Sequence, residues 1–246
     1  MLQIPKIRAI TLDLDDTLWP IWPVIARAEA ALGQWLQRHA PATAALMADP
    51  AIRLELRDQV VRTQPDIAHN MSSVRRELIR LALHRSREDA RLAELAFEVF
   101  FEHRMKVDLF DDVLPSLAFL AERFPVVAVS NGNADVHRVG LGAYFHGSVS
   151  AHEIGVGKPD RRIFDAGAAA AGVAPEEVLH VGDDGTLDVL GGLNAGMQTA
   201  WLNRDAQAWP HVATPHVTLS SLGQLCGLLA SVPPAFRARS PRAGAK

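Results

Sequence analysis

The sequence predicts an α/β fold, a Rossmann-like parallel sheet interrupted by one inserted helical segment. Two observations lead to this prediction. In the second half of the chain, short apolar runs that suit buried strands alternate with segments of helical spacing, an order that produces a parallel sheet covered on both faces. Between the first and second apolar runs, roughly 80 residues show helical spacing and no strand pattern. A segment of that size can form a separate unit.

Six segments carry a strand pattern, because they are short, apolar and bounded by turn or charged residues. They span residues 7–14, 125–132, 147–155, 177–184, 198–203 and 216–219. The first has near-continuous apolar character, which is typical of a strand covered on both faces.

Helical spacing fills the insert, for example at Ile25, Ala28 and Leu32, and Ser86 followed by Asp89 resembles a capping box that would begin a helix. Further helices are expected at residues 114–120, 161–171, 186–197 and 221–229. The patterns divide the chain into an α/β core at residues 1–19 and 108–232, a helical insert at 20–107, and a Pro- and Arg-rich tail at 233–246 for which we expect disorder.

Composition limits the class of protein. The chain has 246 residues, of which 48% are apolar and 22% charged, and its net charge of −3 gives no sign of a nucleic-acid-binding surface. Its one cysteine, Cys226, excludes an internal disulfide and a multi-cysteine zinc site. No apolar stretch reaches the about 18 residues of a membrane span, and the N-terminus lacks a signal-peptide pattern. We therefore expect a cytoplasmic protein without nucleic-acid or membrane partners.

Polar residues gather where three of the predicted strands end. In chain order they are Asp13, Asp15, Ser130, Asn131, Gly132, Asp183 and Asp188, with Lys158 on a loop before another helix. Residues two apart in an extended chain project to the same side, so Asp13 and Asp15 can face one site. Because ligands of open parallel sheets bind beyond the carboxyl ends of the strands, we expect these groups to meet there.

Converging carboxylates need compensation. Two unit charges about 4 Å apart repel by about 4 kcal/mol at an effective dielectric constant of about 20. An all-oxygen site favours Mg²⁺, and Mg²⁺ held by a few carboxylates typically binds substrate phosphate oxygens. Ser130 and Lys158 add a hydroxyl donor and a positive charge for the same phosphoryl group. The pattern predicts phosphoryl chemistry, in which one of two neighbouring aspartates is a nucleophile and the other a general acid and base.

The same residues carry a family resemblance. The stretches DLDDT, SN, GKPD and GDDGTLD occur in the order of the four motifs of the haloacid dehalogenase-like hydrolases, and the helical insert resembles the first type of cap in that superfamily. The resemblance covers about residues 7–229. More narrowly, DLDDTLW, QPDIAHNMSSVRRELI, SNGNA and LHVGDD resemble bacterial phosphatases that act on flavin mononucleotide and on the phosphorylated pyrimidine intermediate of riboflavin synthesis.

The resemblance implies a role for each matching residue. Asp13 would be the nucleophile, Asp15 the general acid and base, and Lys158 the group that neutralises the nucleophile and the transferring phosphoryl group. Mg²⁺ would be bound by Asp183, the Asp13 carboxylate and the Asp15 main-chain carbonyl, with Asp188 as an outer, water-bridged partner.

Ser130 would join the catalytic residues by binding the phosphoryl group. The expected substrate-binding residues are Thr17, Trp19, Arg75, Asn131 and Gly132. For Thr17 a local hydrogen bond that holds the loop is also expected, and for Trp19 packing is the alternative to substrate contact.

These residues allow other interpretations, two of which the sequence excludes. An EF-hand needs glycine and glutamate where Leu18 and Val24 stand, and a P-loop needs Ser or Thr where Pro159 follows Lys158. Dehalogenation, in which an aspartate displaces halide from carbon, stays open, although it needs neither a metal nor the acid at Asp15. A phosphate-binding regulatory protein without turnover also stays open. As substrates, sugar phosphates, nucleotides and phosphoglycolate are alternatives to the flavin-related phosphates.

Overall fold

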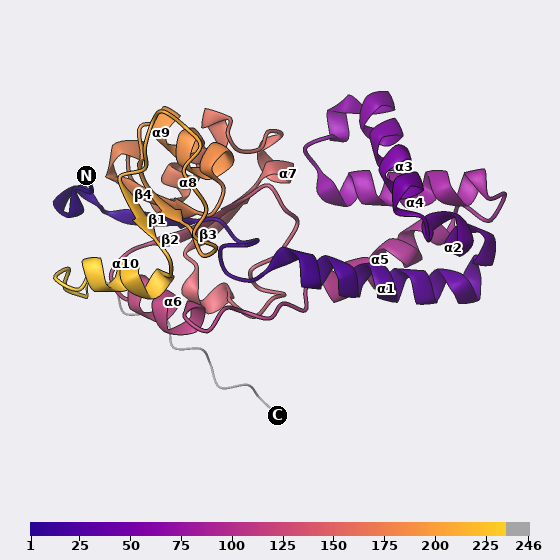
Figure 1. The fold of residues 1–246 in the computed structure, drawn as a ribbon, viewed down its shortest axis with the longest axis horizontal. Coiled ribbons are helices and arrows are strands. Elements are labelled where there is room, and N and C mark those ends of the chain that lie inside the picture. Colours follow the sequence, from indigo (N-terminus) through magenta and orange to yellow (C-terminus); the bar gives the residue numbers. More distant parts are fainter. Residues whose placement is uncertain (235–246) are drawn as a thin grey trace. The chain divides into compact units, whose positions relative to one another are not determined.

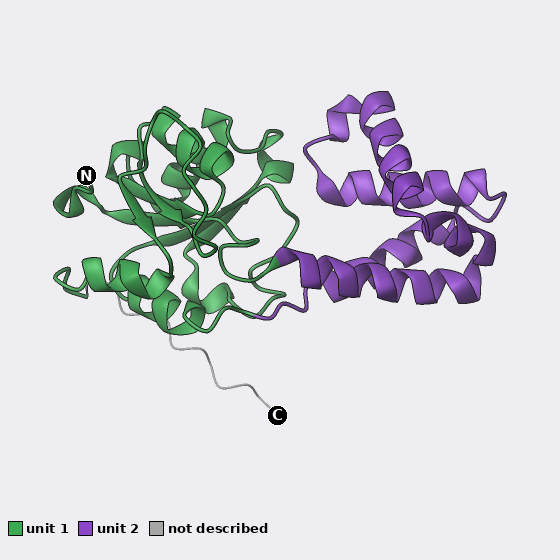
Figure 2. Cartoon of the chain, viewed as in Figure 1, with its two compact units in different colours: residues 1–20, 109–246 green, residues 21–108 purple. Residues whose placement is uncertain are grey.

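The computed structural model describes residues 1–234, and the chain forms two compact units (Figure 2). Residues Met1–Pro20 and the chain from Leu109 onward form the first, which we call the sheet unit, and residues Ile21–Asp108 form the second, the helical unit. The tail for which disorder is expected lies outside the described residues from position 235 on.

The sheet unit is built on six parallel strands in the order β3-β2-β1-β4-β5-β6 (Figure 1). They are β1 (Ala9–Leu12), β2 (Val126–Ser130), β3 (Gly147–Ser150), β4 (Val178–Gly182), β5 (Gln198–Leu202) and β6 (Val217–Leu219). Every residue of β1, β2, β4 and β5 is buried, as expected for strands covered on both faces. The predicted α/β fold with a parallel sheet is therefore confirmed.

Helices cover both faces of this sheet. They are α6 (Val113–Ala121), α7 (Ala151–Ile154), α8 (Arg161–Ala171), α9 (Gly191–Asn194) and α10 (Leu222–Leu228), with a π-helical turn at Gly185–Leu190 before α9. Figure 1 shows α8 and α9 on one side of the sheet, and α6 and α10 on the other. On the face of the sheet that carries α8, residues of this helix and of the central strands form one core cluster. Its members from α8 include Ile163, Phe164 and Ala168, each at most 1% exposed.

The order of the strands marks a place for a ligand. From β1 the chain adds β2 and β3 on one side, and then returns to add β4, β5 and β6 on the other side of β1. Such a reversal between two neighbouring strands leaves a crevice at their carboxyl ends, where open α/β sheets bind ligands. Residues that directly follow β1 and β4 therefore border the expected site.

The helical unit has a core of its own. Its helices are α1 (Ile21–His39), α2 (Pro41–Met47), α3 (Pro50–Thr63), α4 (Met71–Arg85) and α5 (Leu92–Arg104). Leu32, Leu56, Ile79 and Phe97 are among the buried residues that join these helices in one apolar cluster. The predicted helix start at Ser86 is wrong: Ser86 is the C-terminal cap of α4, and the next helix, α5, begins at Leu92.

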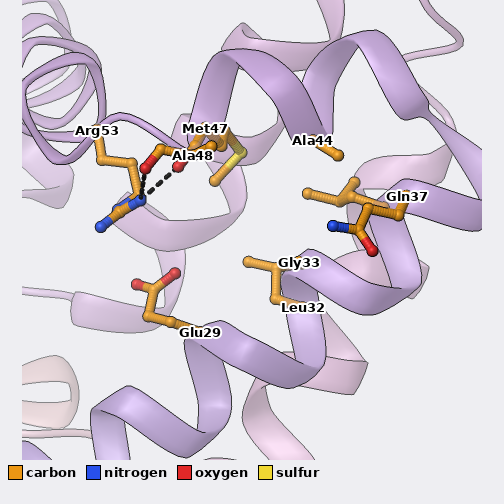
Figure 3. Close-up of a pocket in the computed structure, with 9 residues that line it drawn as sticks. Glu29, Leu32, Gly33, Gln37, Ala44, Met47, Ala48 and Arg53 are labelled. Carbon is orange, nitrogen blue, oxygen red and sulfur yellow. Dashed lines mark hydrogen bonds between the residues drawn. The ribbon is translucent and has the colours of Figure 1, made fainter.

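A pocket of about 140 Å³ lies within the helical unit, between α1, α2 and Arg53 of α3 (Figure 3). Its lining residues are Glu29, Leu32, Gly33, Leu36, Gln37, Ala44, Met47, Ala48 and Arg53. Arg53 donates to the carbonyls of Met47 and Ala48 at the end of α2, and a Cβ on Gly33 would meet no atom within 4 Å. None of the residues predicted to carry chemistry lines this pocket.

Among residues 1–234, none of the helices is both long enough and apolar enough to cross a bilayer.

Candidate active site

The first acidic residue of the site, Asp13, directly follows β1. Its main-chain N–H donates to the carbonyl of Val181 on β4 over 2.9 Å, which extends the pairing of the two strands by one residue. The chain then turns back, with Asp16 in the left-handed region at φ 59° and its N–H bonded to the Trp19 carbonyl. Aspartate tolerates this conformation better than most residues. The turn therefore leaves the Asp13 carboxylate at the edge of the sheet, 7% exposed.

Lys158 reaches the same edge from the loop before α8. Its ammonium group donates to Asp13 Oδ1 and, over 2.7 Å, to Asp188 Oδ1. The side chains of these three residues are between 2% and 10% exposed, so the ion pairs are shielded from water. The structure thus brings the predicted nucleophile and the predicted lysine into direct contact.

The loop that carries Lys158 is fixed by Asn131. The Asn131 side chain accepts a hydrogen bond from Lys158 N at 2.6 Å and donates to the Lys158 carbonyl at 2.9 Å. A Cβ on Gly157 would lie 2.6 Å from Asn131 Oδ1, so glycine is needed for this close approach. The carboxamide of Asn131 is therefore engaged with the lysine loop, which the sequence motif by itself did not indicate.

Asp183, just beyond β4, is held on two sides. Its Oδ1 accepts a hydrogen bond from Thr17 Oγ1 at 3.0 Å, and its main-chain carbonyl accepts one from Trp201 Nε1 at 2.7 Å. One carboxylate oxygen from each of Asp13, Asp183 and Asp188 lies within 4.8 Å of the other two. We call these three residues the acidic trio.

The charge of the acidic trio is not balanced by the protein, because three carboxylates face one ammonium group. Burial first, and then the charges of Asp188 and Asp183, raise the pKa of Asp13 well above its ordinary value of 3.8, although Lys158 opposes the shift. Burial and the charge of Asp188 raise the pKa of Asp183 to about 7. Without a cation, part of the trio must therefore hold protons.

The shifts in pKa of the other two charged groups, Lys158 and Asp188, favour their ionised forms. Burial alone would lower the pKa of Lys158, but the charges of Asp13 and Asp188 raise it above its ordinary value. Burial alone would raise the pKa of Asp188, but Lys158 and a hydrogen bond from His180 hold it below its ordinary value.

The donor set fits Mg²⁺. It consists of carboxylate oxygens only, which Mg²⁺ prefers, and it carries the surplus negative charge that a divalent cation would neutralise. Two oxygens bound to one Mg²⁺ at about 2.1 Å lie at most about 4.2 Å apart, so small side-chain movements would let Asp13 and Asp183 share one ion. Both oxygens of Asp188 already accept N–H groups, from Lys158, His180 and Asp184, which suits the outer role predicted for it.

Two further predicted residues lie at this edge of the sheet. Ser130 ends β2, whose Ala128 is paired with Leu12 of β1, and its hydroxyl accepts a hydrogen bond from Gly132 N at 3.0 Å. Asp15 lies partly buried in the turn after Asp13, and its Oδ1 accepts a hydrogen bond from Trp19 Nε1 at 2.8 Å.

Three residues predicted to contact the substrate have partners within the protein. Thr17 and Trp19 are 0% exposed, so neither side chain offers surface to a substrate; Thr17 holds Asp183 and Trp19 holds Asp15. Arg75 belongs to the helical unit, where its guanidinium pairs with Glu29 at 2.5 Å and lies 4.3 Å from the centre of the Phe100 ring. In this structure its charge is already paired within that unit.

His180, which the sequence motifs did not single out, also contacts the acidic trio. Its imidazole is 1% exposed and lies between Thr11 Oγ1 and Asp188 Oδ1. Burial lowers its pKa. The available signal was a polar residue inside an otherwise apolar strand, because a buried polar group needs a hydrogen-bond partner.

A buried carboxylate after the first strand of a parallel sheet, with a buried lysine and two further aspartates, is the arrangement expected of an α/β enzyme with its site at the carboxyl edge. The chain belongs to the haloacid dehalogenase-like hydrolase family, which it matches over residues 7–196. The resemblance noted from the motifs is thereby confirmed.

Known proteins of this family include near relatives of the chain. It is 34% identical over 232 residues to the 5-amino-6-(5-phospho-D-ribitylamino)uracil phosphatase YigB of Escherichia coli strain K12, an alignment that covers 91% of this chain and 97% of the relative. It is 30% identical to a glyceraldehyde 3-phosphate phosphatase of Methanopyrus kandleri over 80% of this chain and 84% of that protein.

Among solved structures, one described as a 2-haloacid dehalogenase from Pseudomonas syringae pv. Tomato DC3000 superposes with a TM-score of 0.86. It shares 37% sequence identity, and the match covers 91% of this chain and 98% of the other.

Proposed function

We propose that this protein is a Mg²⁺-dependent phosphomonoester hydrolase that works through an aspartyl-phosphate at Asp13. The observation that carries the proposal is the contact between the buried Asp13 carboxylate and Lys158 beside the surplus charge of the acidic trio. The surplus negative charge suits a divalent cation, and that cation together with Lys158 suits the transfer of a group that is itself negatively charged. The named phosphatases among the relatives support the same reaction class.

In the first step, an oxygen of the Asp13 carboxylate attacks phosphorus, and the bond from phosphorus to the leaving alcohol oxygen breaks. Lys158, held against Asp13, offsets the negative charge of the attacking carboxylate and of the phosphoryl oxygens. The Ser130 hydroxyl lies at the same edge as a further donor for those oxygens. Asp15 gives its proton to the departing alkoxide, and Trp19 orients the Asp15 carboxyl for this transfer through the indole N–H.

In the second step, water attacks the phosphorus of the aspartyl-phosphate. Asp15, now a carboxylate, takes a proton from that water, and the bond between phosphorus and the Asp13 oxygen breaks. Inorganic phosphate leaves, and Asp13 and Asp15 return to their initial states. One aspartate thus serves as the nucleophile and its neighbour two residues on as the proton carrier.

Mg²⁺ would be held by Asp13 and Asp183, with the Asp15 carbonyl and Asp188 as further partners, and when bound it neutralises developing charge on the phosphoryl oxygens. The chain's own contribution is to hold these carboxylates in place. Thr17 fixes Asp183 through its hydroxyl, and Trp201 fixes the main chain at the same residue.

For the substrate, we infer a small phosphorylated metabolite. The relative that aligns over nearly its whole length is named for a ribitylaminouracil phosphate, and this, with flavin mononucleotide, is the substrate class that we propose first. The second relative is named for glyceraldehyde 3-phosphate, so the family accepts leaving groups of very different size.

Dehalogenation is the second candidate, because the structure from Pseudomonas syringae is described as a 2-haloacid dehalogenase. In that reaction the aspartate would displace halide from carbon. Halide needs no proton to depart, so the acid at Asp15 and the surplus charge of the acidic trio would be without use. These two features favour the phosphatase.

One comparison separates the two activities. The same preparation is assayed for phosphate release from p-nitrophenyl phosphate and from a panel of phosphorylated metabolites, and for halide release from 2-chloropropionate, each with Mg²⁺ and with EDTA. The phosphatase proposal predicts phosphate release that EDTA abolishes, with no halide release. Halide release that persists in EDTA, without phosphate release, would favour the dehalogenase.

A further inference from the structure

A chain of buried hydrogen bonds leads from the interior of the sheet to the acidic trio. Thr11 of β1 and His180 of β4 are partners across adjacent strands, and Thr11 Oγ1 lies 2.8 Å from His180 Nδ1. On the other side of the imidazole, Nε2 lies 3.1 Å from Asp188 Oδ1. The three residues are at most 1% exposed, so bulk water does not compete for these hydrogen bonds.

The chemistry of the partners sets the direction of both bonds. Asp188 Oδ1 also accepts from the Lys158 ammonium group at 2.7 Å, and a carboxylate has no hydrogen to donate. His180 Nε2 must therefore carry the hydrogen, which leaves Nδ1 as the acceptor for the Thr11 hydroxyl. Asp188 thus selects the tautomer of His180, and the Thr11 hydroxyl, which can donate or accept, donates to Nδ1.

The residues around Asp188 leave room for one position of its carboxyl group. A Cβ on Gly182 would lie 2.2 Å from Asp188 Cγ, so glycine alone leaves room for the carboxyl group against β4. Asp184 N donates to Asp188 Oδ2 at 3.0 Å. His180 provides the matching donor for Oδ1, the oxygen that also binds Lys158, and the Phe164 ring packs edge-on against the imidazole at 5.0 Å between centroids.

From this arrangement we infer that His180, supported by Thr11, is a positioning residue for the metal and phosphoryl site. It acts through Asp188, which it turns toward Lys158 and the rest of the acidic trio, and it touches neither substrate nor metal itself. The inference rests on the proposed function, because it supposes that the trio binds Mg²⁺. Partners that orient metal-binding carboxylates in this way typically contribute about 10- to 100-fold to metal affinity or activity.

The test compares two substitutions of His180 by calorimetric titration with MgCl₂, without substrate. His180→Leu keeps apolar volume but has no N–H donor, and we expect it to bind Mg²⁺ at least about 10-fold more weakly than the wild type. His180→Gln restores an amide N–H near the position of Nε2, so it should recover most of the lost affinity. As a matched control, His216→Leu removes a different histidine of the sheet, which accepts a hydrogen bond from Thr199 N, and should leave Mg²⁺ affinity unchanged.

Urea unfolding of the same variants separates positioning from packing. A purely structural role predicts lower stability of His180→Leu with wild-type Mg²⁺ affinity of the folded protein, and that result would overturn the inference. If His180→Leu does not fold, Thr11→Val against Thr11→Ser decides, because only the first loses the hydroxyl while keeping a β-branched shape; equal Mg²⁺ affinity in this pair would overturn it as well. Wild-type protein that binds no Mg²⁺ would instead overturn the proposed function.

Discussion

Two groups of charged side chains, one in each unit, differ in their surroundings. In the helical unit, Arg76 pairs with Glu94 and Arg85 with Glu55, each cation facing an acid on the surface. In the sheet unit, Lys158 meets two buried carboxylates, Asp13 and Asp188, and a third, Asp183, lies close by. Charge is balanced and solvated in the first case, and unbalanced and shielded from water in the second.

This difference separates stabilising contacts from a functional site. Exposed ion pairs contribute about 0–1 kcal/mol each, so the pairs of the helical unit have small effects on folding. Buried carboxylates without full compensation oppose folding, and they persist where a ligand supplies the missing charge. The surplus charge of the sheet unit therefore supports the proposal that a cation and the substrate bind there.

The largest expected effect comes from the nucleophile. Asp13→Asn removes the attacking oxygen charge, so we expect hydrolysis of p-nitrophenyl phosphate to fall at least about 10³-fold, which corresponds to about 4 kcal/mol of transition-state stabilisation. Because the substitution also removes one of three crowded acids, the metal-free variant should be at least as resistant to urea as the wild type. Near-normal turnover by the folded variant would exclude Asp13 as the nucleophile.

Removal of Lys158 should show how far the buried ion pairs differ from exposed ones in their effect on the free energy of unfolding. Lys158→Met keeps the length of the side chain but leaves buried carboxylates without their cation, so we expect a loss of about 3–5 kcal/mol in urea unfolding of the metal-free protein. Activity should fall at least about 10²-fold as well. A change below 1 kcal/mol would show that the buried ion pairs are no more important than exposed ones.

The raised pKa values predict how pH and Mg²⁺ act together. Asp183, with a pKa of about 7 in the folded protein against 3.8 ordinarily, holds a proton that the unfolded chain releases, so its contribution makes the metal-free protein less stable as pH rises from about 4 to about 7. Mg²⁺ replaces such protons, and at 100 times its dissociation constant it would stabilise by about 2.7 kcal/mol. The gain in melting temperature on adding a fixed Mg²⁺ concentration should be larger at pH 8 than at pH 5.5; equal gains would argue against cation binding by these carboxylates.

The smallest effect is expected in the helical unit. Arg85→Ala breaks an ion pair with Glu55 whose side chains are 45% and 57% exposed, so unfolding free energy should change by less than about 1 kcal/mol. Mg²⁺ affinity should not change. A loss comparable with that of Lys158→Met would remove the contrast between the two units.

Much of the sheet unit could be predicted from the sequence because its signals are local. An apolar run followed by aspartates identifies a buried strand with a polar end, and parallel strands bring such ends to one edge. This reasoning is sufficient to place Asp13, Lys158 and Asp183 near one another. In the helical unit, the prediction that a helix begins at Ser86 is wrong, because a residue that can begin a helix can also follow the end of one.

The remaining contacts depend on the order and register of the strands, which the local patterns of one sequence do not reveal. Thr11 and His180 are 169 positions apart and meet only because β1 and β4 are neighbours. Trp19 is buried because the chain reverses at Asp16, so an aromatic residue beside Asp13 and Asp15 serves to hold Asp15. Asn131 likewise holds the loop that carries Lys158, and this contact depends on how close the fold brings the two loops.

The most direct test of the central claim, that the surplus buried charge is a Mg²⁺ site, is calorimetric titration of wild type, Asp183→Asn and Asp184→Asn with MgCl₂ at pH 7.5. Asp184 is the matched control, since it is an exposed acid on the same loop and its carboxylate caps the turn that follows. We predict one Mg²⁺ per wild-type chain, binding at least about 10-fold weaker in Asp183→Asn, and little change in Asp184→Asn. Equal affinities in wild type and Asp183→Asn would contradict the account.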